Sequence, residues 1–113
     1  MTNVNEKVAI QFIKGKDEKD HPEIRLIRNH DGNKGKAIYK FSNSLTITLE
    51  NYKSIQRMYL IDNEGELSTS KIKLSILGND IKEVTSTYNW STKKEFERFM
   101  RFSERYAISL SNY

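Results

Sequence analysis

Near the C-terminal end of the chain, four basic residues recur at the spacing of one helix face. They are Lys94, Arg98, Arg101 and Arg105, at intervals of four, three and four positions, and an α-helix places such residues on one side. Arginine carries a planar fork of donors that fits carboxylate and carbonyl oxygens. Two interpretations of this basic stripe remain open. One is a solvated outer face that Glu97 and Glu104 partly neutralise. The other is a docking surface for an acidic or carbonyl-rich partner, which the choice of arginine favours.

The basic stripe needs a helix to display it, and the surrounding residues predict one over residues 92–106. Thr92 can cap the first turn while Glu95, three residues later, reaches back, which is the capping-box spacing. At about 100° per residue, the side opposite the stripe is mainly apolar. It holds Phe96, Phe99, Met100, Ser103, Tyr106 and Ala107. Phe102 lies at the flank between the two sides, so the sequence predicts an amphipathic helix with a buried apolar side.

The rest of the chain alternates apolar and polar residues over short stretches, which is typical of β-strands. The predicted strands are residues 8–13, 24–28, 36–41, 45–49, 57–61, 72–76 and 84–90. Residues 72–76, with Ile72, Leu74 and Ile76 inward, are expected as the return strand of a hairpin that turns at residues 62–66. Residues 107–113 alternate weakly and could form a short terminal strand. Strands without intervening helices predict an α+β fold, an antiparallel, sandwich-like β-sheet domain with one C-terminal amphipathic helix packed on it.

Composition narrows the class of protein. The 113 residues suit one domain, residues 1–113, with tails at 1–7 and 108–113 that we expect to be frayed. The absence of cysteine excludes disulfides and thiol chemistry. There is no apolar run of about 18 residues and no secretory or transit signal at the start. A net charge of +4 favours an acidic partner, whether nucleic acid, an anionic membrane surface or an acidic protein.

Residues for catalysis are sparse. His21 and His30 are the two histidines, and both stand in charged, loop-like stretches where a histidine is usually solvated. Asp17, Glu18 and Asp20 lie near His21, but a mixed-charge loop commonly has this composition without holding a metal. No nucleophile motif, phosphate-binding loop or dinucleotide fingerprint occurs. The sequence therefore predicts a protein that is not an enzyme and binds no metal or cofactor.

Nucleic-acid binding by a small basic β-rich domain is the alternative. Residues 34–41 (KGKAIYKF) partly follow the RNA-recognition pattern through Lys34, Gly35, Ala37 and Phe41. The positions that should stack bases are Lys36 and Ile38, so the stacking platform is missing. This alternative is therefore the weaker one.

Three segments resemble a known family. Residues 98–107 (RFMRFSERYA) look like the C-terminal signature of the photosystem II thirteen-kilodalton extrinsic protein family, the Psb-twenty-eight family. Residues 58–65 (MYLIDNEG) are similar to its central strand and turn, and residues 22–28 (PEIRLIR) to its N-terminal half. The order and spacing of the segments match, and the resemblance covers roughly residues 10–106.

The resemblance implies a non-catalytic assembly factor without a cofactor. Such a protein binds transiently to immature photosystem II, on the cytoplasmic or stromal face, near the core antenna and the reaction-centre loops. It would be a peripheral protein of the thylakoid membrane, attached through protein contacts and binding neither nucleic acid nor a small substrate. The expected source is a plastid genome, with a cyanobacterium as the alternative.

We hypothesise two cooperating partner-binding surfaces. A sheet edge or the C-terminal tail could accept an extended segment of a photosystem subunit by strand addition. The basic stripe would fix the orientation electrostatically, together with any of three further arginines that share its side. The complete predicted set is Arg25, Arg28, Arg57, Lys94, Arg98, Arg101 and Arg105.

Overall fold

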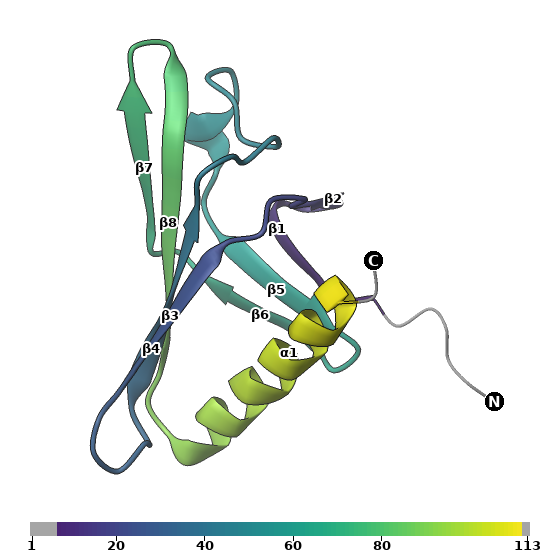
Figure 1. The fold of residues 1–113 in the computed structure, drawn as a ribbon, viewed down its shortest axis with the longest axis vertical. Helices are drawn as coiled ribbons and strands as arrows, with labels where there is room; N and C mark the ends of the chain where they lie inside the picture. The colour runs from purple at the N-terminus through teal and green to yellow at the C-terminus, as the bar shows by residue number, and fades with distance from the viewer. Residues whose placement is uncertain (1–6, 112–113) are drawn as a thin grey trace, which may run out of the picture.

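The computed structural model describes residues 7–111, which form two four-stranded antiparallel sheets with one long helix across them (Figure 1). The first sheet has the order β2 (Lys16–Asp17), β1 (Ala9–Ile13), β5 (Met58–Asp62) and β6 (Gly65–Thr69). The second has the order β3 (Glu23–Arg28), β4 (Gly35–Phe41), β8 (Asp80–Trp90) and β7 (Ile72–Leu77). A short 3-10 helix, η1 (Tyr52–Ser54), and the α-helix α1 (Lys93–Ser111) complete the described elements. The predicted α+β class, with sandwich-like antiparallel sheets and a C-terminal helix, is confirmed.

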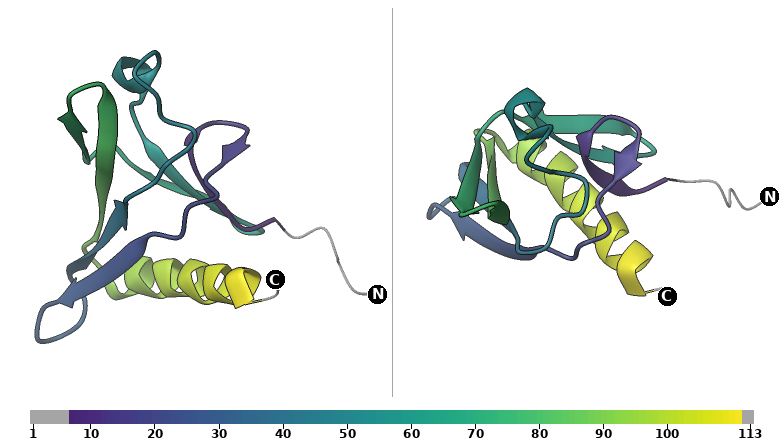
Figure 2. Two further views of the ribbon diagram at one scale, coloured as in Figure 1. Left: turned by 45° about the horizontal axis from the view of Figure 1, so that its top comes forward. Right: turned by 90° about the horizontal axis from the view of Figure 1, so that it is seen from above.

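The core fills the space between the two sheets and α1. In β4, Ala37, Tyr39 and Phe41 are at most 1% exposed, and in β5 Met58 and Leu60 are 0% exposed. These are the inward positions that strict alternation predicts, because successive side chains of a strand point to opposite faces. Figure 2 shows α1 running along one side of both sheets, which diverge as they leave it. The helix therefore closes the core from the side.

The start of α1 follows the capping pattern that the sequence predicts. The Glu95 N–H donates to Thr92 Oγ1 at 3.1 Å, and the Ser91 N–H donates to Glu95 Oε1 at 2.7 Å. These bonds satisfy backbone donors that have no partner within the first turn of a helix. Phe99 then stacks on the rings of Tyr88 and Trp90, with centroids 5.4 and 5.1 Å apart. The aromatic side chains of β8 therefore pack directly against α1.

Three expectations for the helix were wrong. Phe102 is 0% exposed and lies in the core, whereas Ala107 is exposed. The buried side of α1 centres on Phe99, Phe102 and Tyr106, so it is rotated toward the arginines relative to the predicted side. Residues 107–111 continue the helix and do not form a terminal strand, since Leu110 still packs against the core. The rest of the two predicted tails, residues 1–6 and 112–113, lies outside the described residues.

The predicted strand over residues 45–49 is also wrong. The side chain of Asn51 accepts a hydrogen bond from the Thr48 N–H and donates one to the Thr46 carbonyl, both at 2.9 Å. These bonds hold the segment as a loop in place of a ladder. Only Ile47 is buried among its alternating apolar residues, while Leu45 is 71% exposed. The alternating pattern at residues 45–49 therefore belongs to a loop in which Ile47 is the one buried apolar side chain.

The hairpin at residues 62–66 returns through β6, not through residues 72–76 as predicted. After β6 the chain crosses at Ser70 and Lys71 into the second sheet, where β7 pairs with β8. The pairing shifts register between Ser75 and Ile76, and Ile76 is 41% exposed, so its predicted inward position is also wrong. Within residues 7–111, no helix is both long and apolar enough to span a bilayer.

Candidate functional site

Three arginines of the basic stripe converge on the turn between β5 and β6. Arg98 donates to both carboxylate oxygens of Asp62, at 2.7 and 2.8 Å, and Arg105 Nη1 lies 2.9 Å from Asp62 Oδ2. Arg101 donates to both oxygens of Glu64 at 2.8 and 2.9 Å, and Arg105 also reaches Glu64. We call these five residues the arginine clasp. It ties α1 to the β5–β6 hairpin through paired, charge-assisted hydrogen bonds.

The clasp is partly shielded from water. The Asp62 side chain is 0% exposed and that of Arg98 is 17% exposed, whereas Arg101 is 49% exposed. Burial by itself would raise the pKa of Asp62, but the hydrogen bonds from Arg98 and Arg105 outweigh it and the pKa lies below its usual range. Hydrogen bonds from Arg101 and Arg105 lower the pKa of Glu64 to about 2. Both carboxylates are therefore ionised at neutral pH and balance most of the arginine charge.

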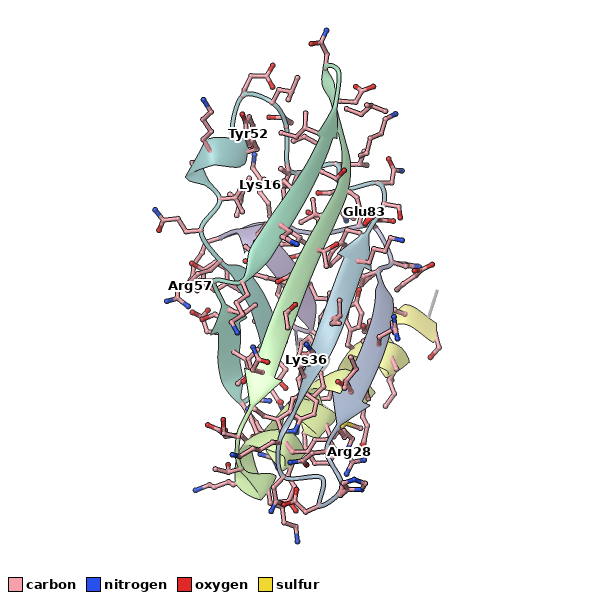
Figure 3. The ribbon with its side chains drawn as sticks, turned by 90° about the vertical axis from the view of Figure 1, so that its left-hand side faces the viewer. Lys16, Arg28, Lys36, Tyr52, Arg57 and Glu83 are labelled. Atoms are coloured by element: carbon pink, nitrogen blue, oxygen red, sulfur yellow. The ribbon has the colours of Figure 1, made fainter. Side chains whose placement is uncertain are left out.

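Two of the other predicted binding residues, Arg28 and Arg57, make their contacts outside the clasp. Arg28 lies over the ring of Phe96, with its guanidinium carbon 4.2 Å from the ring centroid. Arg57 donates to Ser68 Oγ at 3.2 Å. Figure 3 shows Arg28 near one end of β3 and Arg57 beside the start of β5, well apart in that view. Arg25 and Lys94 are exposed and form no ion pair with another residue in the range 7–111.

Sequence reasoning missed Asp62 and Glu64, which it treated only as part of a turn. Their signal is weak, because two carboxylates in a hairpin turn are common. What gives them a role is their position opposite the arginines, 36 and 37 residues away along the chain. The partner-binding role of the stripe stays a prediction, and the clasp limits which of its residues are free to serve it.

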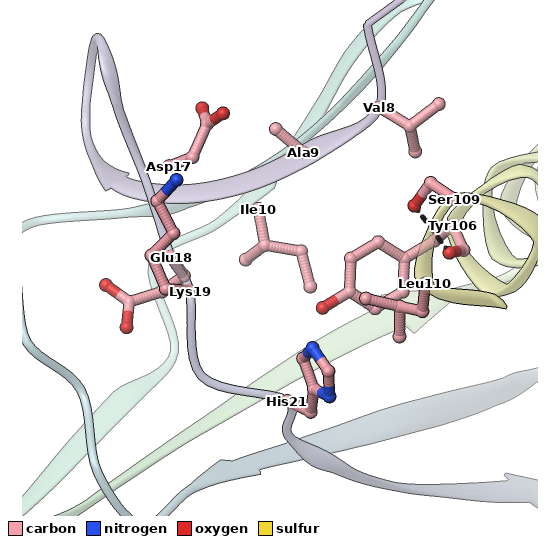
Figure 4. A pocket seen from close by; sticks show the side chains of 10 residues that line it. All are labelled: Val8, Ala9, Ile10, Asp17, Glu18, Lys19, His21, Tyr106, Ser109 and Leu110. Atoms are coloured by element: carbon pink, nitrogen blue, oxygen red, sulfur yellow. Dashed lines mark hydrogen bonds between the residues drawn. The ribbon is translucent and has the colours of Figure 1, made fainter. Parts of the chain in front are cut away.

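An open depression of about 430 Å³ lies between β1, the loop after β2 and the C-terminal end of α1 (Figure 4). The rings of His21 and Tyr106 and the side chain of Ile10 face it, while the Glu18 carboxylate points away from them. Glu18 instead accepts a hydrogen bond from Thr46 Oγ1 and so holds the 42–51 loop. These lining residues do not bring an acid and a base together on one substrate position.

The structure also shows where the residues lie that could support nucleic-acid binding or metal binding. Tyr39 and Phe41, the aromatic residues of the RNA-recognition-like segment, are at most 1% exposed and cannot stack on bases. Among residues 7–111, no group of three or more histidine, aspartate or glutamate side chains is arranged to hold a metal ion.

Comparison with known proteins identifies a matching family and several similar proteins. The family model described as "Psb28 protein" matches residues 10–111, which is nearly the whole described fold. The chain belongs to the Psb28 family. It is 68% identical over 111 residues, 98% of each chain, to the "Photosystem II reaction center Psb28 protein" of Prochlorococcus marinus strain NATL2A. The protein of the same name from Synechococcus sp. strain WH7803 is 41% identical over 102 residues, 90% of this chain and 79% of the relative.

Two of the segments that resemble the family are distant in the sequence but in contact in the fold. Of the three segments that resemble the Psb28 family, residues 58–65 supply the carboxylates of the clasp and residues 98–107 supply its arginines. In the fold these two Psb28-like segments meet face to face. The third, residues 22–28, forms the edge strand β3.

Proposed function

We propose that this chain is a non-catalytic assembly factor that binds photosystem II transiently on the cytoplasmic side of the thylakoid membrane. The observation that carries the proposal is the 68% identity, over 98% of both chains, to a protein named for the photosystem II reaction center. The relatives described above are cyanobacterial, which favours the cyanobacterial source, given above as the alternative, over a plastid genome. The subunits bound would be the core antenna and the reaction-centre proteins.

The outer edge of β3 is the best place for strand addition. β3 pairs with β4 on one side and lies at the end of its sheet, and all six of its residues are exposed. Ile24 and Leu26 are 43% and 46% exposed. An extended segment that paired with this edge would use its free backbone groups and cover both side chains. Arg25 and Arg28, from the predicted set, stand on the same strand and would orient an acidic segment.

The clasp separates the basic stripe into residues that hold α1 in place and residues that remain accessible to a partner. Arg98 and Arg105 serve mainly to hold α1 on the hairpin, because Asp62 and Glu64 already occupy their donors. Lys94 and the outer side of Arg101 remain accessible to a partner. The stripe therefore contributes orientation through its exposed members.

Co-migration on native gels tests the proposal. A tagged chain is followed in solubilised thylakoid membranes, with immature and mature photosystem II probed separately. We expect the wild-type chain to travel with immature complexes alone. A wild-type chain that stays free, or that travels with RNA and is released by nuclease, would contradict the proposed function.

A matched pair of variants tests the β3 edge in the same assay. Leu26→Lys places a charge where the added strand should pack, and Leu77→Lys makes the same change at a side chain that is 68% exposed in the β7–β8 hairpin. We expect Leu26→Lys to lose co-migration and Leu77→Lys to keep it. Equal retention by both variants would place the binding edge elsewhere.

A further inference from the structure

The second sheet turns one face away from the core, and no described element covers that face. α1 and the first sheet pack on its other side, where Ala37, Tyr39 and Val84 are at most 1% exposed. Figure 3 looks onto the uncovered face, with Lys36 near its centre. The proposed strand addition concerns an edge of this sheet, and apart from Arg25 the residues of the face itself have no assigned role.

The strand registers define which residues share this face, because paired residues of an antiparallel sheet point to the same side. The middle row across the sheet is Arg25, Ile38, Thr87 and Lys71. The row on one side of it is Ile27, Lys36 and Asn89. The row on the other side is Glu23, Lys40, Thr85 and Lys73. We call this set, with Glu83 and Ser75 beyond it, the outer face.

The outer face is basic, and most of its charge is free. Five cations, from β3, β4, β7 and the residue just before β7, stand against two carboxylates. The cations are Arg25, Lys36, Lys40, Lys71 and Lys73, and the carboxylates are Glu23 and Glu83. Lys40 approaches Glu83 at 3.6 Å. The other four cations form no ion pair with any residue in the described range 7–111.

The kind of cation differs from that in the clasp. Four of the five are lysines, which carry a compact charge on a flexible stem and fit no particular acceptor geometry. They are spread over a whole sheet face and not gathered in a groove. A broad array of flexible charges suits a partner whose negative charges are themselves spread over a surface and mobile.

We propose that the outer face binds the anionic headgroups of a lipid bilayer directly. Lysines beside an anionic bilayer are attracted over about a Debye length, and clusters of four or more are enough for measurable association. Ile27, 42% exposed, and Ile38 lie between the charges and can contact the headgroup layer. Membrane contact would not require any photosystem subunit, so this proposal stands independently of the proposed function.

Other anionic partners fit the outer face less well. Single-stranded RNA gains much of its affinity from bases stacked on aromatic rings, and none of the face residues named above is aromatic. An acidic peptide would cover only one or two of the strands, and would leave much of the charge unused.

Vesicle co-sedimentation tests the proposal with the full chain. Vesicles of phosphatidylcholine with about 30% phosphatidylglycerol supply the anionic surface, and pure phosphatidylcholine vesicles are the neutral reference. We expect binding to the anionic vesicles at low salt, and its loss as salt is raised. Equal binding to neutral vesicles, or no binding to anionic vesicles at low salt, would overturn the proposal.

Two triple variants with the same change in charge show whether the face is responsible. Lys36→Gln, Lys71→Gln and Lys73→Gln together neutralise the outer face, whereas Lys19→Gln, Lys53→Gln and Lys93→Gln remove three exposed lysines elsewhere. We expect the first triple to lower the vesicle partition coefficient by about tenfold or more and the second by no more than about threefold.

Equal losses in the two triples would overturn the proposal, since net charge alone would then account for binding. A first triple that keeps vesicle binding but loses binding to an RNA oligonucleotide would overturn it in favour of nucleic acid. Circular dichroism of each triple confirms that the fold is unchanged. Because the vesicles contain no photosystem, a negative result leaves the native-gel test of the proposed function unaffected.

Discussion

The carboxylate of Asp62 receives two hydrogen bonds from the guanidinium group of Arg98, at 2.7 and 2.8 Å, although 36 residues separate the two in the chain. The Asp62 side chain is 0% exposed, so its charge is stabilised by this bidentate pair and by Arg105, not by water. The pair joins the end of β5 to the second turn of α1. It therefore fixes how the helix is rotated against the sheet.

Removing Arg98 leaves a buried carboxylate with less than its full set of donors. We expect Arg98→Ala to lower the free energy of unfolding by about 2–4 kcal/mol, somewhat less than for a fully broken buried pair because Arg105 still reaches Asp62. Urea unfolding measures this change in the free energy of unfolding. Lys94→Ala, on the same helix but exposed, serves as the control and should change stability by less than about 0.5 kcal/mol.

The clasp also predicts how stability depends on pH. The pKa of Glu64 is about 2 in the fold, against 4.5 in the absence of its partners, and that of Asp62 is lowered as well. A carboxylate with a lowered folded-state pKa contributes its full stabilisation above its unfolded pKa, and loses it as the pH falls through the folded value. We expect the urea midpoint to fall as the pH drops from about 4.5 toward 2.

The double variant Asp62→Asn, Glu64→Gln isolates the contribution of the clasp to that pH dependence. We expect a shallower decline of the urea midpoint with acid than in the wild type. Glu66→Gln, which removes a carboxylate paired with Lys14 outside the clasp, is the matched control. If the double variant keeps the wild-type slope, other carboxylates dominate acid unfolding.

Phe99 anchors the helix to the aromatic side chains of β8. It is 0% exposed and stacks between Tyr88 and Trp90. We expect Phe99→Ala to cost about 3–5 kcal/mol, since it leaves a cavity in the core. Thermal or urea unfolding measures the loss, and Ile108→Ala, at a side chain 60% exposed on the same helix, should be nearly neutral. A stable Phe99→Ala would mean that the helix packs through other residues.

Gly35 allows β3 and Trp90 to approach the start of β4. A Cβ atom at this position would lie 2.5 Å from the Ile27 carbonyl oxygen and 2.6 Å from Trp90 Cζ2. We expect Gly35→Ala to destabilise the fold by about 1–3 kcal/mol. Trp90 is the chain's one tryptophan, so a red shift of its emission would report the displaced ring directly. Unchanged emission and stability would contradict the close packing.

A variant at Lys94 can test partner binding without changing stability, whereas a variant at Arg98 would change stability as well. Lys94 is exposed and lies outside the clasp, so Lys94→Glu should leave the unfolding transition unchanged. If the exposed end of the basic stripe orients a partner, the same variant should weaken co-migration with photosystem II by several-fold, most strongly at low salt. Glu97→Lys, with the opposite change on the same helix, should not weaken it. Undiminished co-migration of Lys94→Glu would remove this end of the stripe from the interface.

Much of the fold follows from local pattern. The buried Ala37, Tyr39 and Phe41 alternate with less buried neighbours because β4 is covered on one side only, and the same alternation of burial holds for Met58 and Leu60 in β5. The alternation near Ile47 has the same appearance but no strand to pair with, because Asn51 binds the backbone there. A periodic pattern identifies which side chains can be buried, not which backbone groups will pair.

The candidate site was harder to predict than the fold, because its geometry depends on distant residues. The spacing of Arg98, Arg101 and Arg105 correctly places them on one side of a helix. That Asp62 and Glu64 meet them depends on the rotation of α1 against the sheets, to which the clasp and the buried Phe102 both contribute. Local sequence carries no information on that rotation to the accuracy of a hydrogen bond.

The position of α1 after all the strands has a consequence for biosynthesis. Phe99, Phe102 and Tyr106 belong to the core, and every strand they cover is made before them. A nascent chain that has not yet released α1 exposes the inner faces of β4, β5 and β8 to water. Folding therefore cannot finish while synthesis of the sheets is under way, and premature termination before Lys93 should produce a chain that aggregates or is degraded.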